Sequence, residues 1–170
     1  MTSDTTTAGA PVVRNLHARD LEAVIALDAR IIGRRRDEFF RIKLDQALKE
    51  TGIQVSLAAE VDGRFAGFLL SRVFYGEFGA MEAVAVLDSF GVHPAFRGKG
   101  VARALLAQLR TNLLGLGIAR LQTEVDWNSQ DLLGFFHGEG FLPAPRLCLD
   151  LDLEAHRDRW AAREEEADPA

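Results

Sequence analysis

HPAFRGKGVARALLAQL, residues 93–109, joins a basic, glycine-rich turn to a leucine-rich amphipathic run that is typical of a helix. The N-terminus of a helix exposes backbone N–H groups and carries a partial positive charge. Gly98 and Gly100 would let a ligand approach those N–H groups closely, because glycine has no Cβ. Arg97 and Lys99 add full positive charges beside them. This turn is therefore predicted to bind an anion, and a phosphate or pyrophosphate fits best.

Two common phosphate-binding motifs do not match this turn. A P-loop requires its first glycine where His93 stands and a serine or threonine where Gly100 stands. The dinucleotide fingerprint requires a third glycine at the position of Arg103. The turn matches the pattern Arg-x-x-Gly-x-Ala instead, through Arg97, Gly100 and Ala102. Taken by itself, the stretch could also be a tight turn whose charges are only solvated.

The hydrophobic pattern of the whole chain predicts an α/β (α+β) fold. Strands are expected at residues 12–16, on both sides of the Asp62-Gly63 hairpin turn within 53–74, at 82–92, at 119–125 and, with strict alternation, at 146–153. Helices are expected at residues 17–32, 37–50 (ended by Gly52), 100–116 and 129–140. We expect residues 1–11 to form a flexible tail, 12–153 a single domain, and 154–170 a charged tail or short helix.

The composition is that of a folded cytoplasmic domain. The chain has 170 residues, of which 48% are hydrophobic, and a net charge of −5, which argues against a general nucleic-acid binder. No apolar run approaches the ~20 residues of a membrane span, and the polar N-terminus does not resemble a secretory signal. The single cysteine, Cys148, fits a reducing compartment.

Three landmarks together resemble the GNAT superfamily of N-acetyltransferases. The first is VHPAFRGKGVA (92–102), which matches the family's acetyl-CoA pyrophosphate motif without a gap. The second is Asn128 after the following strand, and the third is the pair Gly140-Phe141 after the next helix. The resemblance covers about residues 12–153 and implies a GNAT-like mixed, mostly antiparallel central sheet flanked by helices.

The resemblance also implies acetyl-CoA (coenzyme A) as co-substrate and assigns residues that bind it. Pantetheine would enter a gap between the strand at 82–92 and the strand at 119–127, and would pair with the backbone of the first strand as an added strand would. The amine acceptor attacks the thioester directly, so no nucleophile of the enzyme is needed. The predicted coenzyme-binding residues are Phe90, Gly91, Val92, Arg97, Gly98, Lys99, Gly100, Val101, Ala102, Asn128 and Phe136.

The attacking amine must lose a proton, which requires a base. Asp88 is the first candidate, because a carboxylate in the apolar run AVAVLDSFGV requires an interaction partner or a functional role. The alternative is a structural aspartate that accepts hydrogen bonds from turn N–H groups. Glu82 and Glu77 are weaker candidates, nearer the start of the strand.

The usual proton donor to the leaving thiolate is absent from the sequence. In the family this donor is often a tyrosine, and the corresponding position here is Phe136, while the only tyrosine is Tyr75 in another segment. Either the coenzyme leaves as an unprotonated thiolate, which a thiol pKa of ~8.5 allows near neutral pH, or another side chain donates the proton. The adjacent His137 is expected at the surface, and Cys148 is expected to be structural.

The acceptor and any metal are less clearly marked. Residues 33–40 could line the acceptor pocket, where three arginines would favour an acidic acceptor, or they could form a solvated helix start. The histidines, at positions 17, 93, 137 and 156, show no ligand spacing, so no metal is expected.

The sequence therefore predicts an enzyme that moves an acetyl group from acetyl-CoA to a primary amine of a small molecule or protein. The alternatives are a different acyl donor or an oxygen acceptor, a catalytically silent acyl-CoA-binding module, and a nucleotide-binding domain. A homodimer is expected, because the alternating C-terminal strand and the apolar segment 68–78 offer edges that seldom stay unpaired.

Overall fold

The structure, a computed structural model, describes residues 9–49, 53–75 and 82–155. It contains two compact units, one ending at Leu133 and one beginning at Gly134, and each is described by itself. A single acetyltransferase domain over residues 12–153 stays a prediction. Within the described ranges, no helix has the length and apolar character needed to cross a bilayer.

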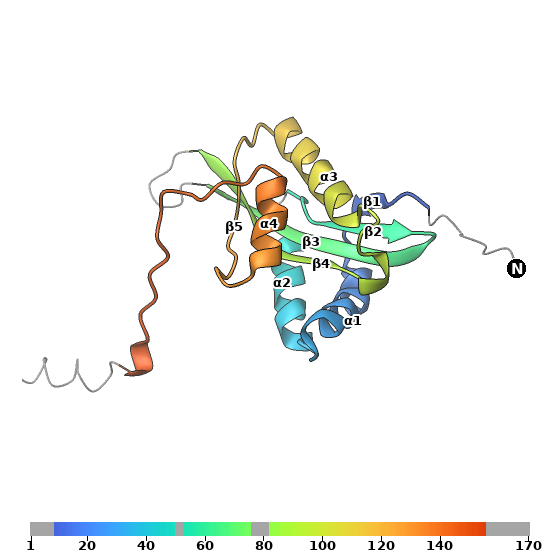
Figure 1. The fold of residues 1–170 in the computed structure, drawn as a ribbon, viewed down its shortest axis with the longest axis horizontal. Helices are drawn as coiled ribbons and strands as arrows, with labels where there is room; N and C mark the ends of the chain where they lie inside the picture. The colour runs from blue at the N-terminus through green and yellow to red at the C-terminus, as the bar shows by residue number, and fades with distance from the viewer. Residues whose placement is uncertain (1–8, 50–52, 76–81, 156–170) are drawn as a thin grey trace, which may run out of the picture. The chain divides into compact units, whose positions relative to one another are not determined.

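The described part of the first unit is built on a five-stranded sheet in the order β1-β2-β3-β4-β5 (Figure 1). Neighbouring strands are antiparallel except β4 and β5, which are parallel. The sheet is therefore mixed and mostly antiparallel, which confirms the predicted fold class. Its strands are β1 (Val12–Asn15), β2 (Leu57–Val61), β3 (Arg64–Tyr75), β4 (Ala83–Val92) and β5 (Leu121–Thr123).

The hairpin between β2 and β3 forms at the predicted Asp-Gly pair. Asp62 and Gly63 both have positive φ, 51° and 71°, as the two central residues of a type I′ turn do. The backbone twist of this turn matches the twist of the two strands, so two residues suffice to reverse the chain. The turn brings Arg64 to the start of β3, close to the end of β4.

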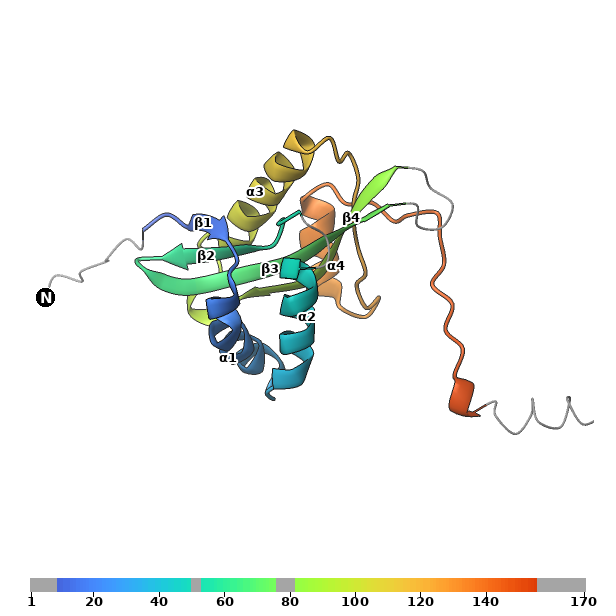
Figure 2. The same ribbon diagram turned by 180° about the vertical axis from the view of Figure 1, so that it is seen from behind.

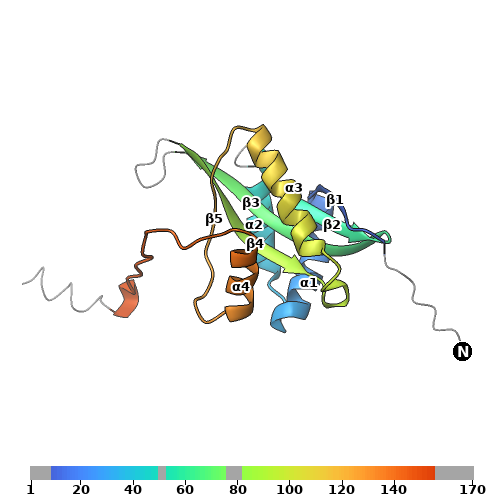
Figure 3. The same cartoon turned by 45° about the horizontal axis from the view of Figure 1, so that its top comes forward.

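Helices cover both faces of this sheet (Figures 2 and 3). On one face lie α1 (Leu21–Ile32), which follows a short 3-10 turn, η1 (Ala18–Asp20), and α2 (Asp37–Lys49). On the opposite face lies α3 (Val101–Gly115), packed against β1 to β4. The helices therefore begin and end within a few residues of the predicted positions. Gly52, expected to end α2, lies outside the described residues.

The core follows from the periodicity of these elements. The buried side chains of α3 recur at helical spacing, so one stripe of the helix faces the sheet. β3, in the middle of the sheet, is buried on both faces between Gly67 and Ser71. Burying each large aliphatic side chain stabilises the fold by about 1.5–3 kcal/mol. Among the side chains below 2% exposure are Leu16, Ile25, Phe40, Phe68, Leu105 and Leu109.

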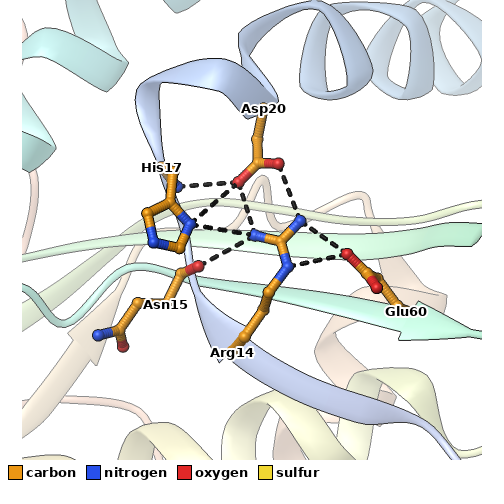
Figure 4. Close-up of polar contacts among 5 residues, drawn as sticks. All are labelled: Arg14, Asn15, His17, Asp20 and Glu60. Carbon is orange, nitrogen blue, oxygen red and sulfur yellow. Dashed lines mark hydrogen bonds and ion pairs between the residues drawn. The ribbon is translucent and has the colours of Figure 1, made fainter. Parts of the chain in front are cut away.

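Arg14 on β1 joins the start of α1 to β2 through ion pairs (Figure 4). Its Nη1 and Nη2 donate to the two carboxylate oxygens of Asp20 at 2.7 and 2.9 Å, and its Nε donates to Glu60 at 2.8 Å. Burial raises the pKa of Asp20, but hydrogen bonds from Arg14 and from the His17 N–H together lower that pKa below its usual value. Asp20 therefore stays ionised, and its pair with Arg14 links β1 to the start of α1.

The second unit begins inside α4 (Gln130–Gly138) and continues to the end of the described chain. The ring centroid of Phe136 lies 5.4 Å from that of Phe135 and 4.9 Å from that of Phe141. Offset and edge-on arrangements at such distances are favourable for aromatic rings. Phe136 is buried, so this position has a packing role in its own unit.

The predicted strand at residues 146–153 does not form. Residues 146–152 have no regular secondary structure, and residue 153 begins a single helical turn. Alternating leucines produce a strand only where another strand takes up the backbone hydrogen bonds, and the described part of the second unit contains no strand. Leu147 and Leu149 are 89% and 87% exposed. Cys148 between them is also exposed, so its expected structural role is wrong.

Candidate active site

The turn between β4 and α3 has the conformation that an anion site requires. A 3-10 helix, η3 (Pro94–Phe96), follows β4, and His93 Nδ1 caps it by accepting the N–H of Ala95 at 3.2 Å. Gly98 and Gly100 then adopt positive φ angles of 74° and 78°. A Cβ at either glycine would meet nothing within 4 Å, so the backbone there is open to a ligand.

The first turn of α3 lacks a protein cap. Gly100 occupies the N-cap position without a side chain, and the first intrahelical bond runs from the Ala104 N–H to Gly100 O at 2.9 Å. The N–H groups of Val101 and Ala102 precede that bond and point out of the helix start. This fully described turn carries no acidic side chain either. The positive end of α3 is therefore available to an anionic ligand, which fits the predicted phosphate site.

Two cations rest on the buried ring of Phe96 beside this turn. Lys99 Nζ and Arg64 Cζ each lie 5.4 Å from the ring centroid. Arg97 is exposed, as are Gly98 and Gly100. The sequence patterns did not indicate Arg64, because it reaches the turn only through the β2–β3 hairpin. The anion site therefore carries one more positive charge than its motif alone predicts.

His93 contributes no charge to the site near neutral pH. Burial lowers the pKa of its imidazole, and the positive charges of Arg30 and Arg64 lower that pKa further. A neutral ring is also what the η3 cap requires, because Nδ1 must keep its lone pair to accept the Ala95 N–H. The imidazole is therefore a structural element of the loop.

β4 is paired on both sides over only part of its length. Its parallel ladder with β5 runs from Ala85 to Leu87, where Thr123 Oγ1 donates to Leu87 O at 3.0 Å. Its antiparallel ladder with β3 continues to Val92. The stretch 88–92 therefore extends beyond the β5 ladder, at the place where the sequence predicts an added ligand strand.

Asp88 is the extra residue of a β-bulge at the start of that stretch. Leu70 of β3 pairs with Ser89, and the next residue, Ser71, pairs with Leu87, so Asp88 is skipped in the register. A bulge bends its strand and re-aims the side chain that it carries. The aspartate is thus presented where β4 and β5 separate.

Two cations from different elements hold the Asp88 carboxylate. Lys43 Nζ of α2 donates to Oδ2 at 2.7 Å, and Arg72 Nη2 of β3 lies 3.4 Å from the same oxygen. Arg72 also donates to Gln46 Oε1 at 3.4 Å. The partners of Asp88 are therefore cationic side chains and not the turn N–H groups of the alternative reading. The three charged side chains are 18–23% exposed, so solvent or a small ligand reaches them.

Two predicted coenzyme-binding residues also have packing roles. A Cβ at Gly91 would lie 2.9 Å from atoms of both Leu27 and Phe68, so the packing of α1 on the sheet requires glycine there. The side chain of Val101 is 1% exposed, so only its backbone can face a ligand. Phe90 and Val92 are half-buried on the part of β4 beyond the β5 ladder.

The other candidates for the base were Glu82 and Glu77, and the structure does not place Glu82 near Asp88. Glu82 is exposed just before β4 begins. Six residues of extended strand, about 20 Å, separate it from Asp88. Glu77 lies outside the described residues. Among the described residues, Asp88 is therefore the one of these predicted carboxylates that lies where β4 and β5 separate.

Asn128 and Phe136 lie in different units. Asn128 is exposed and lines a shallow pocket at the start of α4 together with residues 129–132. Phe136 belongs to the aromatic cluster of the second unit, and the neighbouring His137 is exposed, as the sequence predicts. Among the described residues, no group of three or more histidine, cysteine or acidic side chains could hold a metal ion.

The arginines at residues 34–36 are less available than their sequence suggests. Arg35 pairs with Asp37 at 2.6 Å and with Glu22 at 3.2 Å. Arg36 pairs with the buried Asp28 at 2.6 Å. These intramolecular carboxylates offset the positive charge of both guanidinium groups. The expectation that this cluster attracts an acidic acceptor is therefore weakened.

A family comparison agrees with the geometry of the β4–α3 turn. The sequence model described as the acetyltransferase (GNAT) family matches residues 14–141, which run from β1 past α4. The match includes the whole anion loop, residues 93–100 between β4 and α3. The chain therefore belongs to the GNAT acetyltransferase family and is an acyltransferase.

Solved structures share its fold. The aminoglycoside N-acetyltransferase AAC(6′)-Iy in complex with CoA is 19% identical, with 87% of this chain and 97% of that chain covered and a TM-score of 0.71. A ribosomal-protein-alanine N-acetyltransferase from Brucella melitensis biovar Abortus 2308 is 24% identical, covering 84% and 99%, with a TM-score of 0.68. Arabidopsis thaliana Naa50 with a bisubstrate analogue is 15% identical, covering 84% and 92%, with a TM-score of 0.66.

Proposed function

We propose that this protein transfers an acetyl group from acetyl-CoA to a primary amine by direct attack in a ternary complex. One observation carries the proposal: the uncapped, cation-flanked start of α3 follows β4, and the part of β4 beyond the β5 ladder begins at Asp88. A pyrophosphate at the start of α3 and a pantetheine arm along the end of β4 would direct the thioester toward Asp88. Neighbours of the same fold that bind CoA or a CoA-containing analogue support a coenzyme site in this protein.

Asp88 is the group that we propose to remove the proton from the attacking amine. An acceptor arrives as an ammonium ion, and a carboxylate that already binds the ammonium of Lys43 has the chemistry to bind another. Arg72 would then keep the carboxylate in place while the acceptor replaces Lys43. Because the amine itself attacks, the exposed Cys148 has no role in the reaction.

We propose that the coenzyme leaves as a thiolate or takes a proton from solvent. The position of the usual tyrosine is Phe136, which cannot donate a proton. A thiol pKa of about 8.5 makes departure of the thiolate inexpensive near neutral pH. Activity should therefore rise little when a tyrosine is introduced by Phe136→Tyr.

Release of free thiol from acetyl-CoA tests the proposal. The purified protein is mixed with acetyl-CoA and a panel that includes an aminoglycoside, a polyamine and a peptide with a free N-terminus, because the neighbours act on aminoglycosides and proteins. Thiol release above background with one of these amines supports transfer. Because Phe136 cannot donate a proton to the leaving thiolate, a second candidate function is a silent acyl-CoA-binding module. Such a module would bind the coenzyme and release no thiol with any amine.

We also propose a homodimer formed through residues 146–153, in the cytoplasm, where a lone cysteine stays reduced. Leucines occupy every second position of this segment and are 59–89% exposed, so they form one apolar face when the segment becomes extended. A second copy offers the same face and the missing backbone partners. Light scattering at micromolar concentration should give the dimer mass, and Leu149→Lys should shift it to the monomer. A monomeric wild-type protein would contradict the proposal.

A further inference from the structure

We propose that Lys43 is an acetylation site of this protein, modified by its own active centre. The inference rests on the proposed function and extends it to an internal acceptor. Lys43 Nζ lies 2.7 Å from Asp88 Oδ2, the carboxylate to which we assign proton removal. Lys43 is therefore a primary amine already held against that base, in the arrangement that an external acceptor would have to reach.

The position of this amine distinguishes it from the other lysines of the chain. Lys43 approaches the bulge of β4 from α2, where the β4–β5 ladder has ended. Lys49 lies on the same helix, pairs with Asp45, and is 73% exposed. Lys99 lies in the anion loop beside Phe96. No other lysine occurs in the sequence, so an acetylated lysine has only three possible positions.

The surroundings of Lys43 also tolerate the modified side chain. Its Nζ is 5.7 Å from the ring centroid of Phe39, and its side chain is only 23% exposed. Acetylation removes the positive charge, so the modified lysine is less costly to keep half-buried. Asp88 would still be paired with Arg72, so no carboxylate is left without a cation.

The step balances with acetyl-CoA as the only co-reactant. Asp88 takes one proton from the Lys43 ammonium and passes it to solvent. The freed lone pair of Nζ forms a bond to the acetyl carbon, and the carbon–sulfur bond breaks. The coenzyme leaves as a thiolate, which solvent can protonate to CoASH, and the nitrogen releases its second proton to solvent, so Lys43 becomes an amide.

Mass spectrometry of the protein after incubation with acetyl-CoA alone tests the inference. We expect one acetyl group, placed on Lys43 by fragment-ion sequencing and added about tenfold or more faster than on Lys49, because the Lys43 amine is held beside its base. The fraction modified per minute should not depend on protein concentration. Lys43→Arg, which keeps a cation beside Asp88, should abolish the modification, and Lys49→Arg should leave it unchanged.

The other outcomes separate this inference from the proposed function. Acetylation that favours the exposed Lys49 over Lys43 is ordinary chemical acetylation and overturns the inference. Thiol release with an external amine but no acetyl group on Lys43 also overturns it, while the proposed function stands. No thiol release with any amine, together with an unmodified Lys43, refutes both.

Discussion

At the scale of single residues, the proposed mechanism depends on Asp88. Its carboxylate lies between Lys43 and Arg72 at a bulge, and such a cluster serves either to remove a proton or to anchor α2 on the sheet. The two roles differ in what is lost when the negative charge is removed. A proton-accepting role affects turnover, whereas an anchoring role affects stability.

The substitution Asp88→Asn keeps the size and polarity of the side chain but cannot accept the proton. We expect turnover with a saturating amine to fall about 10²–10⁴-fold, as is typical when a general base is lost. The affinity for CoA should hardly change, because the anion loop begins beyond Val92. Steady-state thiol release and calorimetric titration measure the two quantities.

Asp45→Asn is the matched control, since Asp45 pairs with Lys49 on the exposed side of α2. It should change neither quantity. If Asp88→Asn melts earlier but keeps its turnover per bound coenzyme, Asp88 has an anchoring role and is not the base.

Arg97 tests the charge of the anion loop. Arg97→Ala should weaken CoA binding by about 1.5–3 kcal/mol, the contribution of a charge-assisted hydrogen bond, while the backbone N–H groups keep part of the affinity. Titration calorimetry measures the change, with Arg110→Ala, further along α3, as a variant that should bind normally. Unchanged affinity in Arg97→Ala would exclude this loop as the coenzyme site.

At the scale of elements, the start of α3 is the proposed coenzyme site and its end is not. Both ends have a glycine with positive φ, 78° at Gly100 and 73° at Gly117, and a Cβ at either would meet nothing within 4 Å. Both positions therefore favour glycine for the same conformational reason, and only Gly100 adjoins the predicted phosphate.

This symmetry gives a matched pair of substitutions. Gly100→Ala and Gly117→Ala should each destabilise the protein by about 1–2 kcal/mol, because alanine is strained at positive φ. Only Gly100→Ala should also weaken CoA binding, since its methyl group enters the open space before the helix. Thermal unfolding and titration measure the two effects. Equal CoA affinity in both variants would contradict the assignment.

At the scale of the whole molecule, the Arg14 cluster links stability to pH. The pKa of Asp20 is below its usual value, so the folded protein binds the proton less readily than the unfolded chain does. The stabilisation is therefore complete above the unfolded pKa of about 3.9 and is lost as the pH falls through the lower folded pKa.

Asp20→Asn removes this contribution. We expect it to lower the free energy of unfolding by about 1.5–3 kcal/mol at neutral pH, because the hydrogen bonds of a charged group are lost. The difference from the wild type should narrow below pH 4. Asp37→Asn, which breaks the exposed pair with Arg35, should be nearly neutral. Denaturant unfolding between pH 7 and 3 checks this; a difference that stays constant with pH would contradict it.

The sequence by itself determined the order of helices and strands from β1 to α4, the Asp62-Gly63 turn and the glycine-rich start of α3. These features depend on backbone preferences and hydrophobic periods that act within a few neighbouring residues. Their physical cause is local, so a short window of sequence contains it.

Only the tertiary structure decided what surrounds those features. Lys43 and Arg72 reach Asp88, and Arg64 reaches Phe96, from elements distant along the chain. No local pattern marks such pairs, because they depend on how helices pack on the sheet and on one skipped residue in the β3–β4 register. The alternating segment 146–153 shows the converse. Its pattern predicts a strand, but a strand forms only when another chain segment supplies the hydrogen bonds.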